Sequence, residues 1–449
     1  LAGAALFVLC CMDLSQLLFA AMGAAAYLAI CALGGLGTAR QGRGPEAATP
    51  SASKEPLCAK SVAAPAPPAA SPPPAQPPRR PSQKPVMPPT FCAVGFEAEV
   101  EELVQRMART SGSQRAVQHI VRAVERVVLP VLPEASVVGF VNTDISCGMA
   151  FRVAVPEIDI VICASPLDIA GLTRDLRPPE LRGAREVKDP SKLAKATLRM
   201  FADRLLAAGG FKFRRSAFRS DEPKVTLLAP PEAGGTFEAT PVELSLNSAT
   251  PGFDAALLAE CGRLDPRARA LALLVRRWAK DRGACHAARG HLPPYAWTLL
   301  AIYYLQVGAE EGPVLPPVSA FRASSALASR GAAAAGQVAA PGVGAPSAPR
   351  GPRQSVGRLF QDFLRFYAER FDFGSEAVAV WNGARGPPCA SQVAEPAGLG
   401  DDAPAAAAPV VEDPFNPARN LGLAMSDGGL EHLHKELRRA TSLCSAGAS

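Results

Sequence analysis

The sequence has few aromatic residues, few histidines and no paired cysteine motif, and each shortage excludes a class of site. Aromatic residues make up 6% of the 449 residues, and the five histidines do not group with acids at metal-ligand spacing. The eleven cysteines contain no C-x-x-C pair, so reduced thiols are expected rather than a zinc site or a disulfide framework. No Ser/His/Asp or Cys/His set indicates nucleophilic catalysis. The net charge of +6 suits a polyanionic partner without requiring one.

An apolar leader occupies residues 1–43. Residues 17–37 carry no charge and are long enough to cross a bilayer, and Arg40 and Arg43 follow directly. If this segment spans a membrane, the positive flank predicts a cytoplasmic location for the rest of the chain. Three interpretations stay open, namely a membrane anchor, an organelle-targeting leader and a translated upstream region. Because the chain starts at Leu1, we expect that its natural N-terminus is missing, and we expect the core in the cytoplasm or nucleus.

Regular structure is predicted from residue 96 onward. Residues 44–95 are rich in Pro and Ala and predict a disordered or polyproline-type linker. Apolar residues at spacings of three and four then predict two amphipathic helices within 96–130. Four β-type runs with an intervening helix at Lys192–Ala208 predict an α/β block; the runs are 136–141, 150–163, 224–228 and 241–247. The chain turns helical after Asp254, with two low-complexity insertions at 320–354 and 383–409.

Three carboxylates form the candidate catalytic constellation. Glu157 and Asp159 are two apart on a predicted strand, so both side chains point to the same face. Glu243 lies on a later strand with the same alternation. Unpaired acids on so apolar a strand would be costly, and three carboxylates on neighbouring strands suit two-metal phosphoryl transfer. Glu157, Asp159 and Glu243 are therefore the predicted catalytic and metal-binding residues, with Mg²⁺ or Mn²⁺ as the ion; a solvated strand face is the alternative for an isolated acid pair.

These motifs resemble those of the terminal RNA nucleotidyltransferases, the poly(A) polymerase and terminal uridylyltransferase group, along most of residues 96–430. The family shows a Gly-Ser turn, a strand with two aspartates, and a third aspartate before an Ile/Leu-Ser-x-Asn run. Here the corresponding residues are Gly139-Phe140, then Glu157 and Asp159, then Glu243-Leu244-Ser245-Leu246-Asn247. The segment 411–422, with letters VEDPFNPARNLG, resembles the family's Glu-Asp-Pro-Phe box. Two Glu-for-Asp changes lengthen the acids by one methylene each, a shift of about 1.5 Å to which hard cations respond poorly.

The resemblance implies a nucleotide pocket. It assigns nucleotide binding to residues spread over much of the chain: Gly139, Phe140, Asp254, Arg276, Lys280, Tyr295, Asp413 and Arg419. Arg276 and Lys280 share a helix face and would grip the triphosphate. Tyr295 would stack on the base, and Asp254 stands near a family position that contacts the ribose. Uridylyl-adding members carry His where Arg419 stands, so adenylyl transfer is favoured over uridylyl transfer.

The fold and function follow as expectations from the resemblance. The fold class is an α/β nucleotidyltransferase domain with a mixed sheet at 131–250, plus a mainly α-helical PAP-associated domain at 251–440 that the helices of 96–130 complete. The expected activity is template-independent transfer of AMP, or less favourably UMP, from NTP to RNA 3′ ends. The expected partners are RNA 3′ ends and NTP but not DNA. Membrane association through residues 17–37 stays open. The chain is expected to be monomeric. The alternatives are a catalytically inactive RNA-binding scaffold, a membrane-tethered interaction protein and a small-molecule nucleotidyltransferase.

Overall fold

The computed structural model describes seven ranges of the chain, all within the compact unit Pro81–Ser449: 90–145, 157–175, 189–218, 222–231, 240–321, 353–388 and 408–446. The predicted apolar leader, nearly all of the predicted linker and most of both predicted insertions lie outside these ranges. Within them, no helix combines the length and the apolar character that a membrane crossing needs. The predicted span at 17–37 lies outside the described residues.

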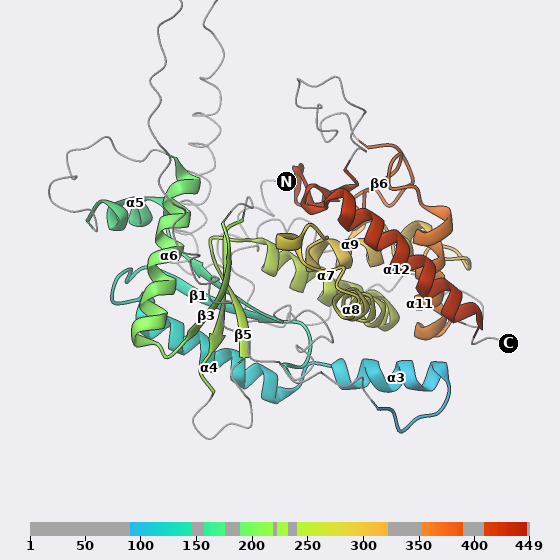
Figure 1. Cartoon of the computed structure of the whole chain (residues 1–449), viewed down its shortest axis with the longest axis horizontal. Helices are drawn as coiled ribbons and strands as arrows, with labels where there is room; N and C mark the ends of the chain where they lie inside the picture. The colour runs from blue at the N-terminus through green and yellow to red at the C-terminus, as the bar shows by residue number, and fades with distance from the viewer. Residues whose placement is uncertain are drawn as a thin grey trace, which may run out of the picture. The chain divides into compact units, whose positions relative to one another are not determined.

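A five-stranded mixed sheet forms the centre of the first half of the described chain (Figure 1). Its strands, in spatial order, are β1 (Ser136–Val141), β2 (Ile158–Cys163), β5 (Thr240–Leu246), β4 (Lys224–Ala229) and β3 (Lys212–Ala217). The central pair β2 and β5 runs parallel, and the other neighbours run antiparallel. The predicted α/β class with a mixed sheet is therefore confirmed.

Alternation along the strands divides the sheet into an apolar face and a polar face. On β2 the side chains of Ile158, Ile160 and Ile162 are fully buried, and the residues between them point the other way. Strand β5 repeats the pattern, with Val242 and Leu244 buried among the same core residues. Every polar residue between these positions, Asp159 and Glu243 included, must therefore project from the opposite face.

Helices α4 (Ser111–Val128) and α6 (Pro190–Ala208) cover the apolar face, and α5 (Pro166–Asp175) packs on α6. Thr110 caps α4 and Asp189 caps α6, each accepting hydrogen bonds from first-turn amides. The close approach of α4 to β1 depends on Gly139, where a Cβ would meet the Val117 Cγ1 at 2.5 Å. The polar face of the sheet is left to the helical part of the chain.

A second core gathers the helices that follow the sheet. Its principal elements are α3 (Phe96–Met107), α7 (Thr250–Leu264), α8 (Pro266–Asp281), α9 (Pro294–Val307), α11 (Val356–Arg365), the π-helical turn Phe366–Arg370 and α12 (Asp427–Ala446). A small three-stranded sheet adds β6 (Ala377–Val378), β7 (Val410–Asp413) and β8 (Asn416–Asn420). Short 3-10 turns occupy Ala287–Arg289, Val318–Ala320 and Leu421–Ala424. Helix α9 is apolar on all sides because it runs through the middle of this core, with Trp297, Tyr303 and Tyr304 fully buried.

The structure differs from the sequence-based predictions in the placement of the two N-terminal helices and in elements that the predictions missed. The two N-terminal helices, expected together in the helical domain, contribute to different cores, because α3 packs on α8 and α11 whereas α4 packs on the sheet. The predictions missed the edge strand β3 and helix α5. The predictions also missed helix α12 at the C-terminal end of the described residues, in which Leu433 and Leu437 are buried.

Candidate active site

Asp159 and Glu243 lie side by side at the centre of the sheet. Their Cα atoms are register partners across the parallel strands β2 and β5. Both side chains project from the polar face, and their side chains remain 28% and 21% exposed. The prediction that these acids occupy neighbouring strands is confirmed. Two carboxylates at this spacing repel each other unless a cation lies between them.

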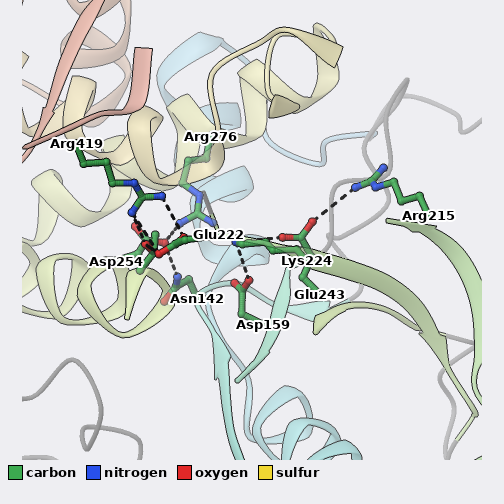
Figure 2. Close-up of polar contacts among 10 residues, drawn as sticks. Asn142, Asp159, Arg215, Glu222, Lys224, Glu243, Asp254, Arg276 and Arg419 are labelled. Carbon is green, nitrogen blue, oxygen red and sulfur yellow. Dashed lines mark hydrogen bonds and ion pairs between the residues drawn. The ribbon is translucent and has the colours of Figure 1, made fainter. Parts of the chain in front are cut away.

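Lysine and arginine side chains from the next two strands supply the positive charge (Figure 2). Lys224 on β4 places its Nζ 3.9 Å from Asp159 Oδ1 and 3.4 Å from Glu243 Oε2. Arg215 on β3 places one guanidinium nitrogen 3.8 Å from Glu243 Oε1 and donates a hydrogen bond from Nε to the Thr226 hydroxyl. Desolvation raises the pKa of the Asp159 carboxyl to about 6, with Lys224 opposing the rise and Glu243 adding to it.

Glu157 is held by a different partner. Its Oε1 accepts a hydrogen bond from Lys280 of α8, and this ion pair is buried, with 1% of the lysine side chain and 8% of the glutamate side chain exposed. The second carboxylate oxygen, Oε2, is buried without a hydrogen-bond partner in the described part of the chain. The structure thus brings Glu157 and Lys280 together, and the pair joins the start of β2 to the helical core.

Asp254 and Arg276 form a second buried ion pair. Asp254 Oδ2 accepts from Arg276 at 2.6 Å and from the Asn142 amide at 3.1 Å, and its Oδ1 accepts from the Thr298 hydroxyl at 2.7 Å. Figure 2 shows the guanidinium of Arg276 and the Asn142 amide converging on this carboxylate. Three donors on one buried carboxylate make Asp254 the hub that connects the end of β1 with helices α7, α8 and α9.

Tyr295, Asp413 and Arg419 meet in a third cluster. The Tyr295 hydroxyl donates to Asp413 Oδ1 at 3.3 Å, and burial, followed by the Asp413 charge, raises the pKa of the tyrosine well above its usual value. Arg419 of β8 places one guanidinium nitrogen 3.3 Å from Asp413 Oδ2 and another 3.1 Å from Glu222 Oε2. It also donates to the Thr250 hydroxyl at 2.7 Å. This cluster therefore bridges the loop before β4 to the helical core.

The predicted Gly-Ser-type turn at Gly139 and Phe140 is wrong. Both residues lie inside β1, where Phe140 pairs with Asp159, and Gly139 is required by the close approach of α4. The chain leaves the strand at Asn142 and Thr143, so the turn begins two or three residues later than the motif match indicated. Asn142 and Thr143 are buried polar residues beside the site, and the Thr143 hydroxyl has no hydrogen-bond partner among the described residues.

Sequence reasoning missed the residues that contact the predicted charged groups: Asn142, Arg215, Glu222, Lys224, Thr250 and Thr298. For Lys224 a signal was available, because Lys224 and Thr226 alternate with Val225 and Leu227 and therefore share the polar face. The partners of Arg419 and Asp254 come from segments more than a hundred residues away or from another element, and no local pattern reveals them.

The family resemblance implies a divalent ion, and two of the three predicted acids are placed to hold one. Asp159 and Glu243 fit one cation, because the Lys224 ammonium already lies against both carboxylates as a cation would. The three predicted acids do not form a joint ligand set, since Glu157 is paired with Lys280. Across the ranges described, no group of three or more His, Cys, Asp or Glu residues is arranged to hold a metal ion.

Comparisons with known proteins identify the relatives of the chain. No family model matches the sequence. The chain is 26% identical over 204 residues to poly(A) RNA polymerase cid11 of Schizosaccharomyces pombe, covering 45% of this chain and 39% of that protein. It is 29% identical over 138 residues to poly(A) RNA polymerase GLD2 of Bos taurus, covering 31% of this chain and 28% of that protein. The chain thus spans about two fifths or less of the curated relatives it matches.

The fold has a counterpart among solved structures. A crystal structure of mtPAP in complex with ATPγS superposes with a TM-score of 0.53 at 16% identity, covering 78% of this chain and 68% of that one. At this identity the superposition supports the fold, and the sequence matches support the relationship. In sequence the chain is similar to poly(A) RNA polymerases, and in fold it is similar to mtPAP.

Proposed function

We propose that the chain transfers nucleotides from NTP to RNA 3′ ends without a template. The observation that carries the proposal is the pairing of Asp159 with Glu243 on the polar face of the sheet. Two partly exposed carboxylates in parallel register form a site for a divalent ion on a rigid scaffold. The relatives are poly(A) RNA polymerases, and such chemistry needs carboxylates fixed on neighbouring strands.

Asp159 and Glu243 are the residues that would hold Mg²⁺ or Mn²⁺. Glu157 would join them only after exchanging Lys280 for the ion, and its free buried oxygen is the atom suited to that role. When bound, the ion would neutralise the triphosphate and lower the pKa of the attacking 3′-hydroxyl. The sheet's contribution is positional, because both acids are fixed by backbone register rather than by loops.

The domain division follows the two cores. Residues 131–250 would act as the nucleotidyltransferase domain and 251–440 as the PAP-associated domain, with α4 added to the first and α3 to the second. The Glu157–Lys280 ion pair and the Asn142–Asp254 hydrogen bond would hold the two domains in register across the site. A basic Arg215 beside Glu243 would attract the polyanionic substrate.

Adenylyl transfer is the proposed preference over uridylyl transfer. Arg419 occupies the position where uridylyl-adding members carry His, and a guanidinium donates hydrogen bonds but never accepts them. Its donors already bind Glu222, Thr250 and Asp413. A side chain held in this way would read the base weakly, so the preference for ATP over UTP should be modest.

An inactive RNA-binding scaffold is the second candidate, and one observation favours it. Arg276 and Lys280, the predicted phosphate-binding cations, both form buried ion pairs with carboxylates. A triphosphate would have to compete with these pairs for its counter-charges. If the pairs persist, the fold could bind RNA without reacting.

An extension assay separates the two functions. A labelled RNA oligonucleotide is incubated with the full chain, Mg²⁺ or Mn²⁺ and each of the four NTPs in turn. The proposal predicts 3′ extension that is greatest with ATP, loss of extension in Asp159→Asn, and no change in Asp203→Asn, a control on the exposed face of α6. RNA binding without extension in any NTP would support the scaffold and refute the transferase.

A further inference from the structure

The Lys224 ammonium contacts the carboxylates of both Asp159 and Glu243. Its ammonium nitrogen lies 3.9 Å from Asp159 Oδ1 and 3.4 Å from Glu243 Oε2, between two carboxylates that would otherwise repel each other. The side chain is 25% exposed. Lys224 is the first residue of β4 and the register partner of Ser245 on β5. The backbone position is therefore fixed by the sheet, and only the flexible side chain reaches the acids.

The lysine and a divalent ion cannot share this position. Mg²⁺ binds carboxylate oxygens at about 2.0–2.1 Å and demands a near-octahedral shell. An ion bound by both acids would lie within a few ångström of the ammonium, where two like charges repel strongly in a partly desolvated site. Binding of the ion therefore requires that the Lys224 side chain withdraws along its four-carbon stem.

We propose that Lys224 is the resident counter-cation of the Asp159–Glu243 pair and competes with divalent metal for that position. The lysine keeps the acids neutralised and the sheet intact in the ion-free protein, and it lowers the apparent affinity for the ion. Entry of the ion expels the ammonium, which becomes available to the phosphates that arrive with it. The inference deepens the proposed function, since it concerns the same acids, but its test uses neither RNA nor NTP.

Metal binding to the free protein tests the proposal. Free Mn²⁺ is followed by electron paramagnetic resonance during titration of the full chain and of its variants. Lys224→Gln removes the competing charge and should lower the Mn²⁺ dissociation constant at least tenfold. Lys224→Arg keeps the charge and should stay within about threefold of the natural protein. The matched control is Lys212→Gln, an exposed lysine at the far end of the β3–β4 pairing, which should change nothing.

The location of the ion is checked in the same titration. Adding Asp159→Asn to Lys224→Gln should abolish the tightened binding. An unchanged or weaker affinity in Lys224→Gln would overturn the proposal, because it would mean that the lysine is no competitor. Failure of this test leaves the transferase proposal in place, whereas a failed extension assay leaves this one in place.

A second measurement needs no variant. Acetylation of lysines by an N-hydroxysuccinimide ester, read by mass spectrometry, reports how accessible each ammonium is. Saturation with Mn²⁺ should raise the labelling of Lys224 several-fold and leave that of Lys212 unchanged. Labelling of Lys224 that stays constant or falls with Mn²⁺ would contradict displacement.

Discussion

Removing the Asp254 carboxylate should destabilise the protein more than any other change at the site. Asp254 is 6% exposed and accepts hydrogen bonds from Arg276, Asn142 and Thr298. Asp254→Ala leaves the Arg276 guanidinium buried without a counter-charge, and breaking such a pair costs about 3–5 kcal/mol. The Asn142 and Thr298 donors also lose their acceptor, and each unsatisfied group adds about 1–3 kcal/mol where water does not reach it.

A double-mutant cycle measures the coupling. Urea unfolding at pH 7 gives the free energy of unfolding for Asp254→Ala, Arg276→Met and the double variant. The double variant should be more stable than Asp254→Ala alone, because a buried Met needs no counter-charge. A cost below about 1 kcal/mol for Asp254→Ala, or strictly additive costs in the cycle, would refute the role of this pair as a structural hub.

Two further predictions concern packing and pH. Gly139→Ala should cost about 1–3 kcal/mol in urea unfolding, because the new methyl group would lie 2.5 Å from Val117 and 2.7 Å from Val121 unless α4 shifts; full stability would show that α4 adapts freely. Burial, with Arg215 and Arg289 nearby, lowers the pKa of His286 to about 4 from its ordinary value of 6.5. Protonation is therefore opposed in the folded state, so stability should fall as the pH drops from 6.5 to 4, by about 1–2 kcal/mol after allowance for partial exposure. His286→Gln should lack this component, and identical pH profiles for both proteins would exclude it.

The parts of the fold that follow local rules could be predicted from the sequence. Strands β1, β4 and β5 and the helices at 190–208, 266–281 and 294–307 show the apolar periods of two and of three to four that buried elements require. Strand β3 was missed because half of its residues (KFRRSA) are charged, as suits an edge strand with exposed sides. Helix α12 was detectable, since Leu430, Leu433 and Leu437 follow a helical period among its charges.

Part of the candidate site could likewise be predicted from the sequence, and part could not. The shared face of Asp159 and Glu243 follows from the strand period, and the register confirms that they are neighbours. Their catalytic role stays a prediction. The partners of Glu157 and Asp254 depend on how α7 and α8 dock against the sheet, which no spacing in the sequence encodes. Motif matching also placed the turn after β1 too early, because a glycine needed for helix packing resembled a turn glycine.

The joint action of Asp159 and Glu243 is tested most directly by the rate of single-nucleotide addition to RNA in Asp159→Asn, Glu243→Gln and the combined variant. If both acids hold one ion, each single change should lower the rate on the order of a hundredfold or more, and the combination should be no slower than the worse single variant. A single variant that keeps the natural rate, or losses that multiply in the combination, would contradict the paired-carboxylate site.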